Sequence, residues 1–137
     1  RYQDILDYEI QMDEEIYGYI IPKLTLQPLV ENALYHGIKN KRGKGKILIT
    51  GKKQGDKIIF QVIDNGKGMT EEELNSLRKK MAGTDTGDEA KGFGVSNVNQ
   101  RIKYYYGEEY GVFFESKENE GTNATIIIAA KNIQLPS

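Results

Sequence analysis

One run of residues constrains the fold of this chain more than any other. Ile58 to Ile63 is almost wholly apolar and β-branched, and it leads directly into Asp64-Asn65-Gly66-Lys67-Gly68. Such a run predicts a strand buried in a sheet. A carboxylate at the end of a buried strand is well placed to accept hydrogen bonds from an exocyclic amine, and glycines let a flat base approach the backbone closely. Asp-Asn-Gly is equally a common turn sequence, so the motif by itself leaves both interpretations open.

Periodicity predicts strands on either side of this run. Residues 47–50 form a second β-branched run, and the residues between the two runs, 51–57, predict a hairpin connection. Residues 5–12 alternate well enough to predict a half-buried strand that ends in a charged turn at 13–15. Near the end of the chain we expect two closing strands, 110–116 and 122–130, joined by the polar turn 117–121.

Three segments have the spacing of amphipathic helices. The first spans about 22–38, and Pro28 implies that its regular part begins near Thr25 or bends there. The second begins with the capping box Thr70-Glu71-Glu72-Glu73 and runs to about Met81. The third spans 94–106. The segments 39–46 and 82–93 are rich in glycine and polar residues and are expected to be loops.

This order of elements predicts an α+β fold. Strands that follow one another in sequence favour a mostly antiparallel, mixed sheet, and the helices are expected to cover one face of it as a two-layer sandwich. A length of 137 residues with 38% apolar content is enough for one core, so residues 1–137 are expected to be a single domain.

Charge and composition exclude several classes of function. The net charge is −1, so no overall field attracts this chain to nucleic acid or to an anionic membrane. There is no cysteine, which excludes a disulfide framework and a thiolate metal site. The lack of cysteine also fits a reducing compartment, so we expect a cytoplasmic location. No apolar run is long enough to span a bilayer, so we expect the fragment to be soluble.

The first predicted helix carries a polar stripe. Asn32, Tyr35, His36 and Lys39 share one face, opposite the apolar positions. A carboxamide oxygen there is a candidate ligand for Mg²⁺, and an imidazole or ammonium group is a candidate contact for phosphate. The simpler interpretation, a solvated helix face, stays open for this stripe alone.

Two further motifs are weak when taken singly. Gly92-Phe93-Gly94 opens the third helix, where backbone amides and the helix dipole favour an anion, but neither a dinucleotide fingerprint nor a P-loop is present. Gly121-Thr122 leads into the last strand, where a threonine hydroxyl can bond a ring nitrogen. A turn glycine followed by a strand threonine is the simpler explanation of that pair.

Together, in this order, the four motifs resemble the gyrase, chaperone, histidine-kinase and mismatch-repair (GHKL) ATPase superfamily over nearly the whole chain. Within it, residues 22–37 (PKLTLQPLVENALYHG) and 92–102 (GFGVSNVNQRI) are similar to the LytS/YesM-like sensor histidine kinases. The resemblance implies the GHKL ATP-binding fold, a site for ATP and Mg²⁺, and phosphoryl transfer in two-component signalling.

The resemblance also implies roles for single residues. Asn32 would ligate Mg²⁺, Asp64 would bind the adenine amino group, and Thr122 would support the base. The glycines would line the adenine pocket or let a loop fold over the phosphates; they are Gly66, Gly68, Gly92 and Gly94. The remaining candidate contacts to ATP are His36, Lys39, Asn97 and Arg101.

Two positions depart from patterns in the superfamily. Tyr35 stands where histidine kinases often have lysine, which makes Lys39 the stronger candidate for a phosphate contact. Pro28 stands where the hydrolytic members carry a glutamate that activates water, and Glu31 lies about 100° around the helix from Asn32. Since a kinase must protect ATP from water, the lack of this base favours a kinase over an ATPase.

The expected function is therefore transfer of the γ-phosphoryl group from ATP to a histidine on a separate, upstream helical domain. His36 is the only histidine of the chain and lies on the nucleotide-facing stripe, so it is not taken as the acceptor. The expected partners are that upstream domain and, through the full-length kinase, a response regulator. The parent kinase is expected to be membrane-anchored. The alternatives are an ATPase of the same fold, a binding module without catalysis and, ranked below both, a serine kinase.

Overall fold

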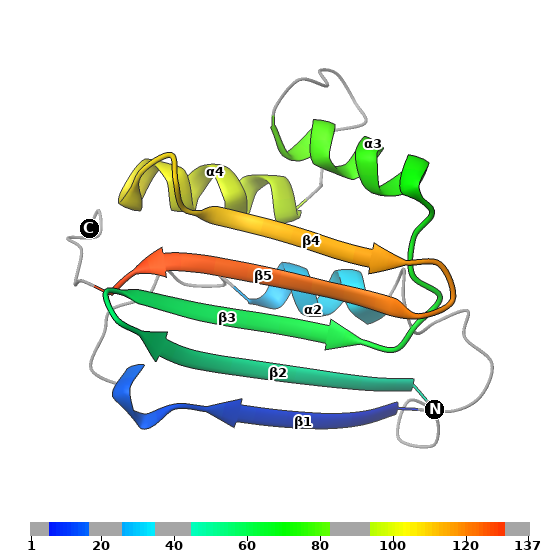
Figure 1. Cartoon of the computed structure of the whole chain (residues 1–137), viewed down its shortest axis with the longest axis horizontal. Helices are drawn as coiled ribbons and strands as arrows, with labels where there is room; N and C mark the ends of the chain where they lie inside the picture. The colour runs from blue at the N-terminus through cyan, green and yellow to red at the C-terminus, as the bar shows by residue number, and fades with distance from the viewer. Residues whose placement is uncertain (1–5, 17–25, 35–44, 83–93, 131–137) are drawn as a thin grey trace.

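A computed structural model describes residues 6–16, 26–34, 45–82 and 94–130, and these contain one five-stranded sheet with the strand order β1-β2-β3-β5-β4 (Figure 1). The strands are β1 (Leu6–Met12), β2 (Gly45–Gln54), β3 (Lys57–Asp64), β4 (Gly111–Lys117) and β5 (Gly121–Ala129). The helices are η1 (Glu14–Ile16, a 3-10 turn), α2 (Gln27–Asn32), α3 (Glu71–Met81) and α4 (Gly94–Tyr106).

The sheet is mixed, as predicted, with a single parallel pair among the described strands. β1 runs parallel to β2, whereas β2–β3, β3–β5 and β4–β5 are antiparallel. The apolar run that ends in Asp64 is the central strand β3, and its last residue pairs with Thr122 at the start of β5. Two of the predicted motifs therefore meet where β3 ends and β5 begins.

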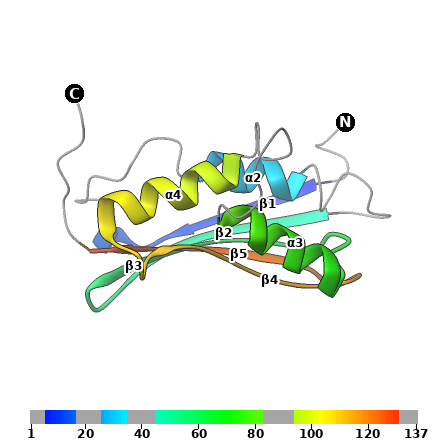
Figure 2. The same ribbon diagram turned by 90° about the horizontal axis from the view of Figure 1, so that it is seen from above.

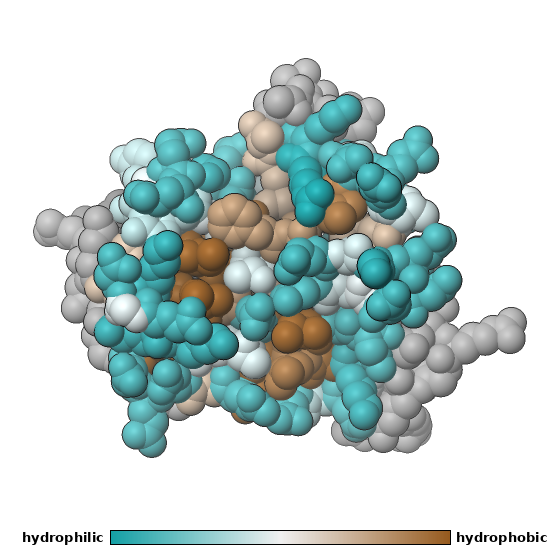
Figure 3. Space-filling model, viewed as in Figure 1, coloured by the Kyte–Doolittle hydropathy of each residue, from teal (hydrophilic) through white to brown (hydrophobic). Residues whose placement is uncertain are grey.

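The helices cover one face of the sheet, as predicted. Figure 2 shows α2 and α4 on the same side of the strands, and α3 packs against α4 and the edge strand β4. Side chains of β2, β3 and β5 that point to this side are buried, including Ile47, Ile58, Val62, Ile126 and Ile128. The opposite face carries polar side chains with apolar ones between them (Figure 3). In β3 every second side chain is buried, which is the period of two expected of a strand with one face on the core.

Local sequence explains where the helices begin. In α3, Thr70 Oγ1 accepts from the backbone N–H of Glu73 at 3.1 Å, and the Glu73 carboxylate accepts from the N–H of Thr70 at 2.9 Å, which confirms the predicted capping box. In α2, Pro28 lies in the first turn, where its missing N–H costs no hydrogen bond. Among the described residues, α2 begins at Gln27, next to the proline, and Thr25 lies outside them.

The predicted hairpin between β2 and β3 is confirmed, but its turn is shorter than the expected 51–57. β2 continues to Gln54, and only Gly55 and Asp56 separate it from β3. Gly51 was taken as the start of the turn, but it is a buried strand residue. A Cβ at this position would lie 2.5 Å from Met12 Sδ and 3.0 Å from both Ile16 and Phe60. Side chains of β1 and η1 therefore pack directly on the backbone of Gly51, where a larger residue would not fit. Similarly, β2 begins at Gly45, inside the segment expected to be a loop.

The expectation that β1 is half-buried is also wrong. Tyr8 is 50% exposed and Ile10 is 64% exposed. Both pair with β2 residues whose side chains are buried, so they lie on the apolar side of the sheet. β1 is the edge strand, which leaves its side chains open to solvent even on that side.

Three predicted segments lie outside the described residues. Residues 17–25 contain the predicted start of the first helix, and residues 35–44 contain its predicted end and most of the following loop. Residues 83–93 are nearly all of the second predicted loop. α4 has the predicted bounds, and β4 and β5 are each shifted by one residue. Within the described part of the chain, no helix is long and apolar enough to cross a membrane.

Asn99 joins three elements in the core. It is 5% exposed, its Nδ2 donates to the carbonyl of Met81 at 3.1 Å, and its Oδ1 accepts from the N–H of Val112 at 2.8 Å. One side chain on α4 therefore satisfies the end of α3 and the start of β4. Because buried polar groups without partners are costly, this amide helps to fix how α3 lies on the sheet.

We predict that Asn99→Ala lowers the free energy of unfolding by about 2 kcal/mol, because it leaves a buried carbonyl and a buried N–H without partners. Urea denaturation measures this. The matched control is Asn97→Ala on the exposed side of the same helix, which should change stability by less than about 0.5 kcal/mol. Equal losses for the two variants would show that the Asn99 bonds do not hold the elements together.

Candidate functional site

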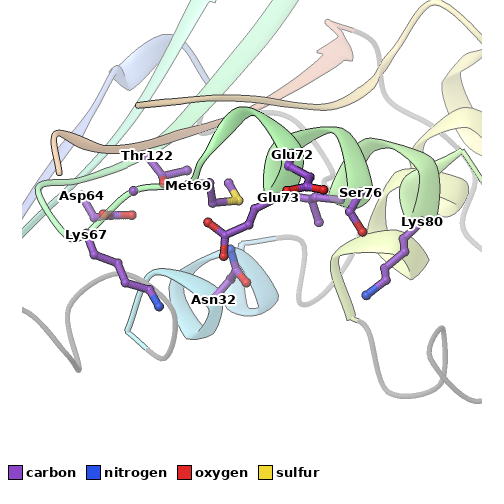
Figure 4. A pocket seen from close by; sticks show the side chains of 11 residues that line it. Asn32, Asp64, Lys67, Met69, Glu72, Glu73, Ser76, Lys80 and Thr122 are labelled. Carbon is purple, nitrogen blue, oxygen red and sulfur yellow. The ribbon is translucent and has the colours of Figure 1, made fainter. Parts of the chain in front are cut away.

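A cavity of about 420 Å³ opens where α2, α3 and the ends of β3 and β5 meet (Figure 4). Its size is within the range of sites for small molecules and cofactors. The wall consists of Asn32, Asp64, Lys67, Gly68, Met69, Glu72, Glu73, Ser76, Leu77, Lys80 and Thr122.

One end of the cavity is built around the Asp64 carboxylate. Asp64 is 6% exposed, and its Oδ1 accepts from the N–H of Gly66 at 2.8 Å. Burial raises the pKa of Asp64, and hydrogen bonds from the backbone N–H groups of Gly66 and Thr122 partly oppose this rise. A buried acceptor of this kind is well suited to a neutral N–H donor of a ligand.

Two glycines let backbone segments meet directly behind this carboxylate. Gly68 has φ +68°, and a Cβ there would lie 1.9 Å from the carbonyl oxygen of Lys117. Gly121 has φ +111°, and a Cβ there would lie 2.0 Å from the carbonyl oxygen of Asp64. The loop after β3 and the turn between β4 and β5 therefore pack backbone to backbone, which only glycine permits.

Ser116 fixes two of the wall residues from behind. Its hydroxyl accepts from the N–H of Met69 at 2.9 Å and lies 2.8 Å from Thr122 Oγ1. The same hydroxyl is 2.8 Å from the carbonyl oxygen of Gly121, to which it donates. Since the Ser116 proton is thereby used, the contact with Thr122 is made with the threonine as donor, and the threonine oxygen keeps its acceptor capacity toward the cavity.

One face of α3 forms the long wall. Glu72, Glu73, Ser76, Leu77 and Lys80 follow the three-to-four spacing of a helix face, with Met69 one turn before them. Met69 and Leu77 supply apolar surface. The Glu73 pKa is lowered, first by its hydrogen bonds to Thr70 and also by the positive charge of Lys67. This carboxylate therefore stays ionised and caps the helix.

The structure brings four of the predicted site residues to this wall: Asn32, Asp64, Gly68 and Thr122. Gly66 is buried behind the wall, where its N–H holds Asp64. Gly94 opens α4 but packs against Pro28, and Asn97 and Arg101 are exposed on α4; none of these three lines the cavity. His36, Lys39 and Gly92 lie outside the described residues.

Sequence reasoning did not assign the α3 wall or Ser116 to the site. The periodicity of α3 was a usable signal, because Glu72, Ser76 and Lys80 share a face distinct from that of its buried residue Leu74. Ser116 carried no signal of its own, since its role depends on the pairing of β4 with β5.

The geometry agrees with a known family. The sequence pattern of the histidine kinase-, DNA gyrase B-, and HSP90-like ATPase family matches residues 22–132. The chain belongs to this family. Its motif residues Asn32, Asp64, Gly68 and Thr122 all come from the matched region and meet at one cavity.

Similar members of the family are sensor kinases, which confirms the resemblance to the LytS/YesM-like group. The chain is 34% identical to sensor histidine kinase YesM of Bacillus subtilis over 132 residues, covering 96% of this chain and 21% of YesM. It is 28% identical to sensor protein LytS of Staphylococcus saprophyticus over 134 residues, covering 98% of this chain and 22% of LytS. The chain thus spans about a fifth of these two relatives.

Solved structures confirm the predicted fold. The catalytic domain of histidine kinase ThkA, in a nucleotide-free form, superposes with a TM-score of 0.63 at 20% identity, covering 94% of this chain and 82% of that domain. ThkA in complex with response regulator protein TrrA gives a TM-score of 0.60 at 21% identity, covering 92% of this chain and 34% of that one. At these identities the likeness establishes the GHKL fold alone.

We predict that Gly68→Ala lowers the free energy of unfolding by about 3 kcal/mol or more, because the new methyl group would displace the Lys117 carbonyl in addition to the strain of a positive φ. Gly55→Ala is the matched control, since Gly55 has φ +59° and no atom within 4 Å of its would-be Cβ. It should cost only about 1 kcal/mol. Thermal or urea unfolding of both variants measures the difference, and equal losses would show that the Lys117 contact yields easily.

Proposed function

We propose that this chain binds Mg²⁺-ATP and transfers the γ-phosphoryl group to a histidine on a separate, upstream helical domain. The observation that carries the proposal is that Asp64, at the end of the central strand, and Asn32, at the end of α2, line the same cavity. Family membership is consistent with this activity. The proposed binding of Mg²⁺-ATP and transfer to histidine are supported by the chemistry of the site.

The Asp64 end suits adenine. A buried carboxylate beside the open backbone of Gly68 offers an acceptor for the exocyclic amine of the base. The Thr122 oxygen, whose proton is donated to Ser116, offers a second acceptor to the same amine. Met69 and Leu77 provide apolar surface for the faces of the ring. Guanine carries a carbonyl oxygen at the position of the adenine amine, so it would place an acceptor against the carboxylate.

The Asn32 carboxamide suits Mg²⁺ that arrives with the phosphates. Mg²⁺ prefers oxygen ligands, keeps several waters and takes few protein ligands when it bridges phosphates. Among the described residues no group of three or more His, Cys, Asp or Glu side chains could hold a metal alone, which agrees with an ion shared between one amide oxygen and the nucleotide. Asn32 lies between the two ends of the cavity in Figure 4. The ion would neutralise charge on the transferring phosphoryl group.

The surroundings of Asn32 favour transfer over hydrolysis. At the position of the hydrolytic glutamate, Pro28 packs against Gly94. Glu31 is exposed, and its carboxylate accepts from Gln27 Nε2 at 3.3 Å instead of lining the cavity. No carboxylate is therefore aimed at a water beside Asn32 from the described part of α2. The ATPase of the same fold remains the second candidate because Glu72 and Glu73 do line the cavity.

In the cell, we propose that the chain works as the cytoplasmic catalytic part of a longer, membrane-anchored sensor kinase. The upstream domain would present the acceptor histidine, and a response regulator would receive the phosphoryl group from it. ThkA, a structural neighbour, is seen in complex with a response regulator, which is consistent with this arrangement.

We predict that wild-type protein binds ATP more tightly with Mg²⁺ than without it, and that Asn32→Ala removes this Mg²⁺ enhancement, weakening Mg²⁺-ATP binding by about tenfold or more. Isothermal titration calorimetry measures both. Glu31→Ala is the matched control on the same helix and should leave the enhancement unchanged. If Asn32→Ala binds Mg²⁺-ATP as the wild type does, Asn32 is not the metal ligand.

The transfer step has its own test. Incubated alone with γ-labelled ATP, the chain should release phosphate very slowly; with a protein that carries the upstream histidine helix of its kinase, it should label that histidine. An acceptor that stays unlabelled while ATP binds would favour a binding module without catalysis. Rapid phosphate release from the isolated chain would favour the ATPase.

A further inference from the structure

The last turn of α3 carries three basic side chains that differ in where they lie. The Arg78 guanidinium donates to the carbonyl of Phe114 at 2.9 Å and is committed to β4. Lys79 is exposed and does not line the cavity. Lys80 is half-buried and lines it. Of these three, Lys80 is the one that lines the cavity.

The position of Lys80 is fixed by α4. The hydroxyl of Ser96 donates to the carbonyl of Lys80 at 3.2 Å, and the amide of Asn99 donates to the carbonyl of Met81 at 3.1 Å. Ser96 and Asn99 are both buried. Two consecutive carbonyls at the end of α3 are therefore held by side chains of a second helix, so the backbone under Lys80 is set before any ligand binds.

The cavity is long, and its two lysines lie at opposite ends. In Figure 4, Lys67 lies beside Asp64, Lys80 lies at the far end next to α4, and Asn32 lies between them. Glu72 and Lys80 are eight residues apart on α3, which is about 12 Å along the helix axis. A ligand with its base against Asp64 that filled this cavity would extend along α3 toward Lys80.

We infer that Lys80 binds the β- and γ-phosphates of the nucleotide. This inference rests on the proposed function, because it takes the base to lie at Asp64 and the metal at Asn32. An ammonium group attracts phosphate as a point charge, and a lysine in the last turn of a helix also offsets the negative end of the helix dipole, which would otherwise repel a phosphate there. Lys80 would thereby add a positive charge from the α3 side to that of the Mg²⁺ ion held at Asn32.

The test compares nucleotides that differ only in their phosphates. Affinities of the wild type and of Lys80→Met for ATP, ADP, AMP and adenosine are measured by calorimetry in Mg²⁺ at fixed ionic strength. We expect Lys80→Met to weaken ATP binding by about tenfold or more and to change adenosine binding by less than about twofold, because the lost contact is to charged phosphate oxygens. Lys79→Met, one residue away and outside the cavity wall, should bind all four ligands as the wild type does.

Two further variants separate charge from structure. Lys80→Arg keeps the charge and should retain most of the preference for ATP over adenosine. Lys80→Glu should lower ATP affinity further than Lys80→Met does, with adenosine again little changed. Thermal unfolding without ligand checks that each variant is folded, which is expected since the side chain is only half-buried.

The outcomes are distinct. Wild-type ATP affinity in Lys80→Met would overturn the role of Lys80 and leave the proposed function standing. An equal loss for ATP and adenosine would also overturn it, since that pattern indicates a damaged cavity. If the wild type binds no adenine nucleotide at all, the proposed function itself fails, and this inference fails with it.

Discussion

The burial of one carboxylate at the end of the central strand is the constraint on which the site depends. Asp64 lies at the point where β3 stops, and two backbone N–H groups, from Gly66 and Thr122, meet it. Burial disfavours the charge and raises the pKa of Asp64, so the group persists there only because the surrounding backbone is held in place. Gly68 and Gly121 make that possible, since any side chain at either position would force the loop and the β4–β5 turn apart.

α3 extends this fixed point across the cavity. Its first turn is closed by the Thr70–Glu73 capping box, and its last turn is held by Ser96 and Asn99 on α4. A helix tied at both ends keeps the residues on its inner face at constant spacing, so the two ends of the cavity keep a set distance. Preorganised contacts of this kind reduce the cost of ordering the site when a ligand binds.

Sequence reasoning succeeded where local chemistry decides structure. The bounds of α4 were predicted, and α3 was predicted with its cap, because capping and helical periodicity are properties of neighbouring residues. It failed where tertiary contacts decide. Gly51 was expected in a turn, yet it is a strand residue covered by Met12 and Ile16. In the site, Asp64 and Thr122 were found from motif order, whereas Ser116 and Lys80 depend on which elements meet in space. Their positions follow from strand pairing and from the packing of α3 on α4.

The contact between Pro28 and Gly94 links packing to chemistry. Pro28 lies in the first turn of α2, and its Cβ is 3.1 Å from where a Cβ of Gly94 would lie. The helix that carries Asn32 therefore packs closely against the start of α4, and this contact is made at the position where the resemblance implies a catalytic glutamate in hydrolytic members of the superfamily. A glutamate there would bring a longer, charged side chain to a contact between a ring and a bare backbone, and its charge would need solvent or a partner. In the proposed function, Pro28 would therefore account both for the close approach of the two helices and for the missing glutamate at this position of α2.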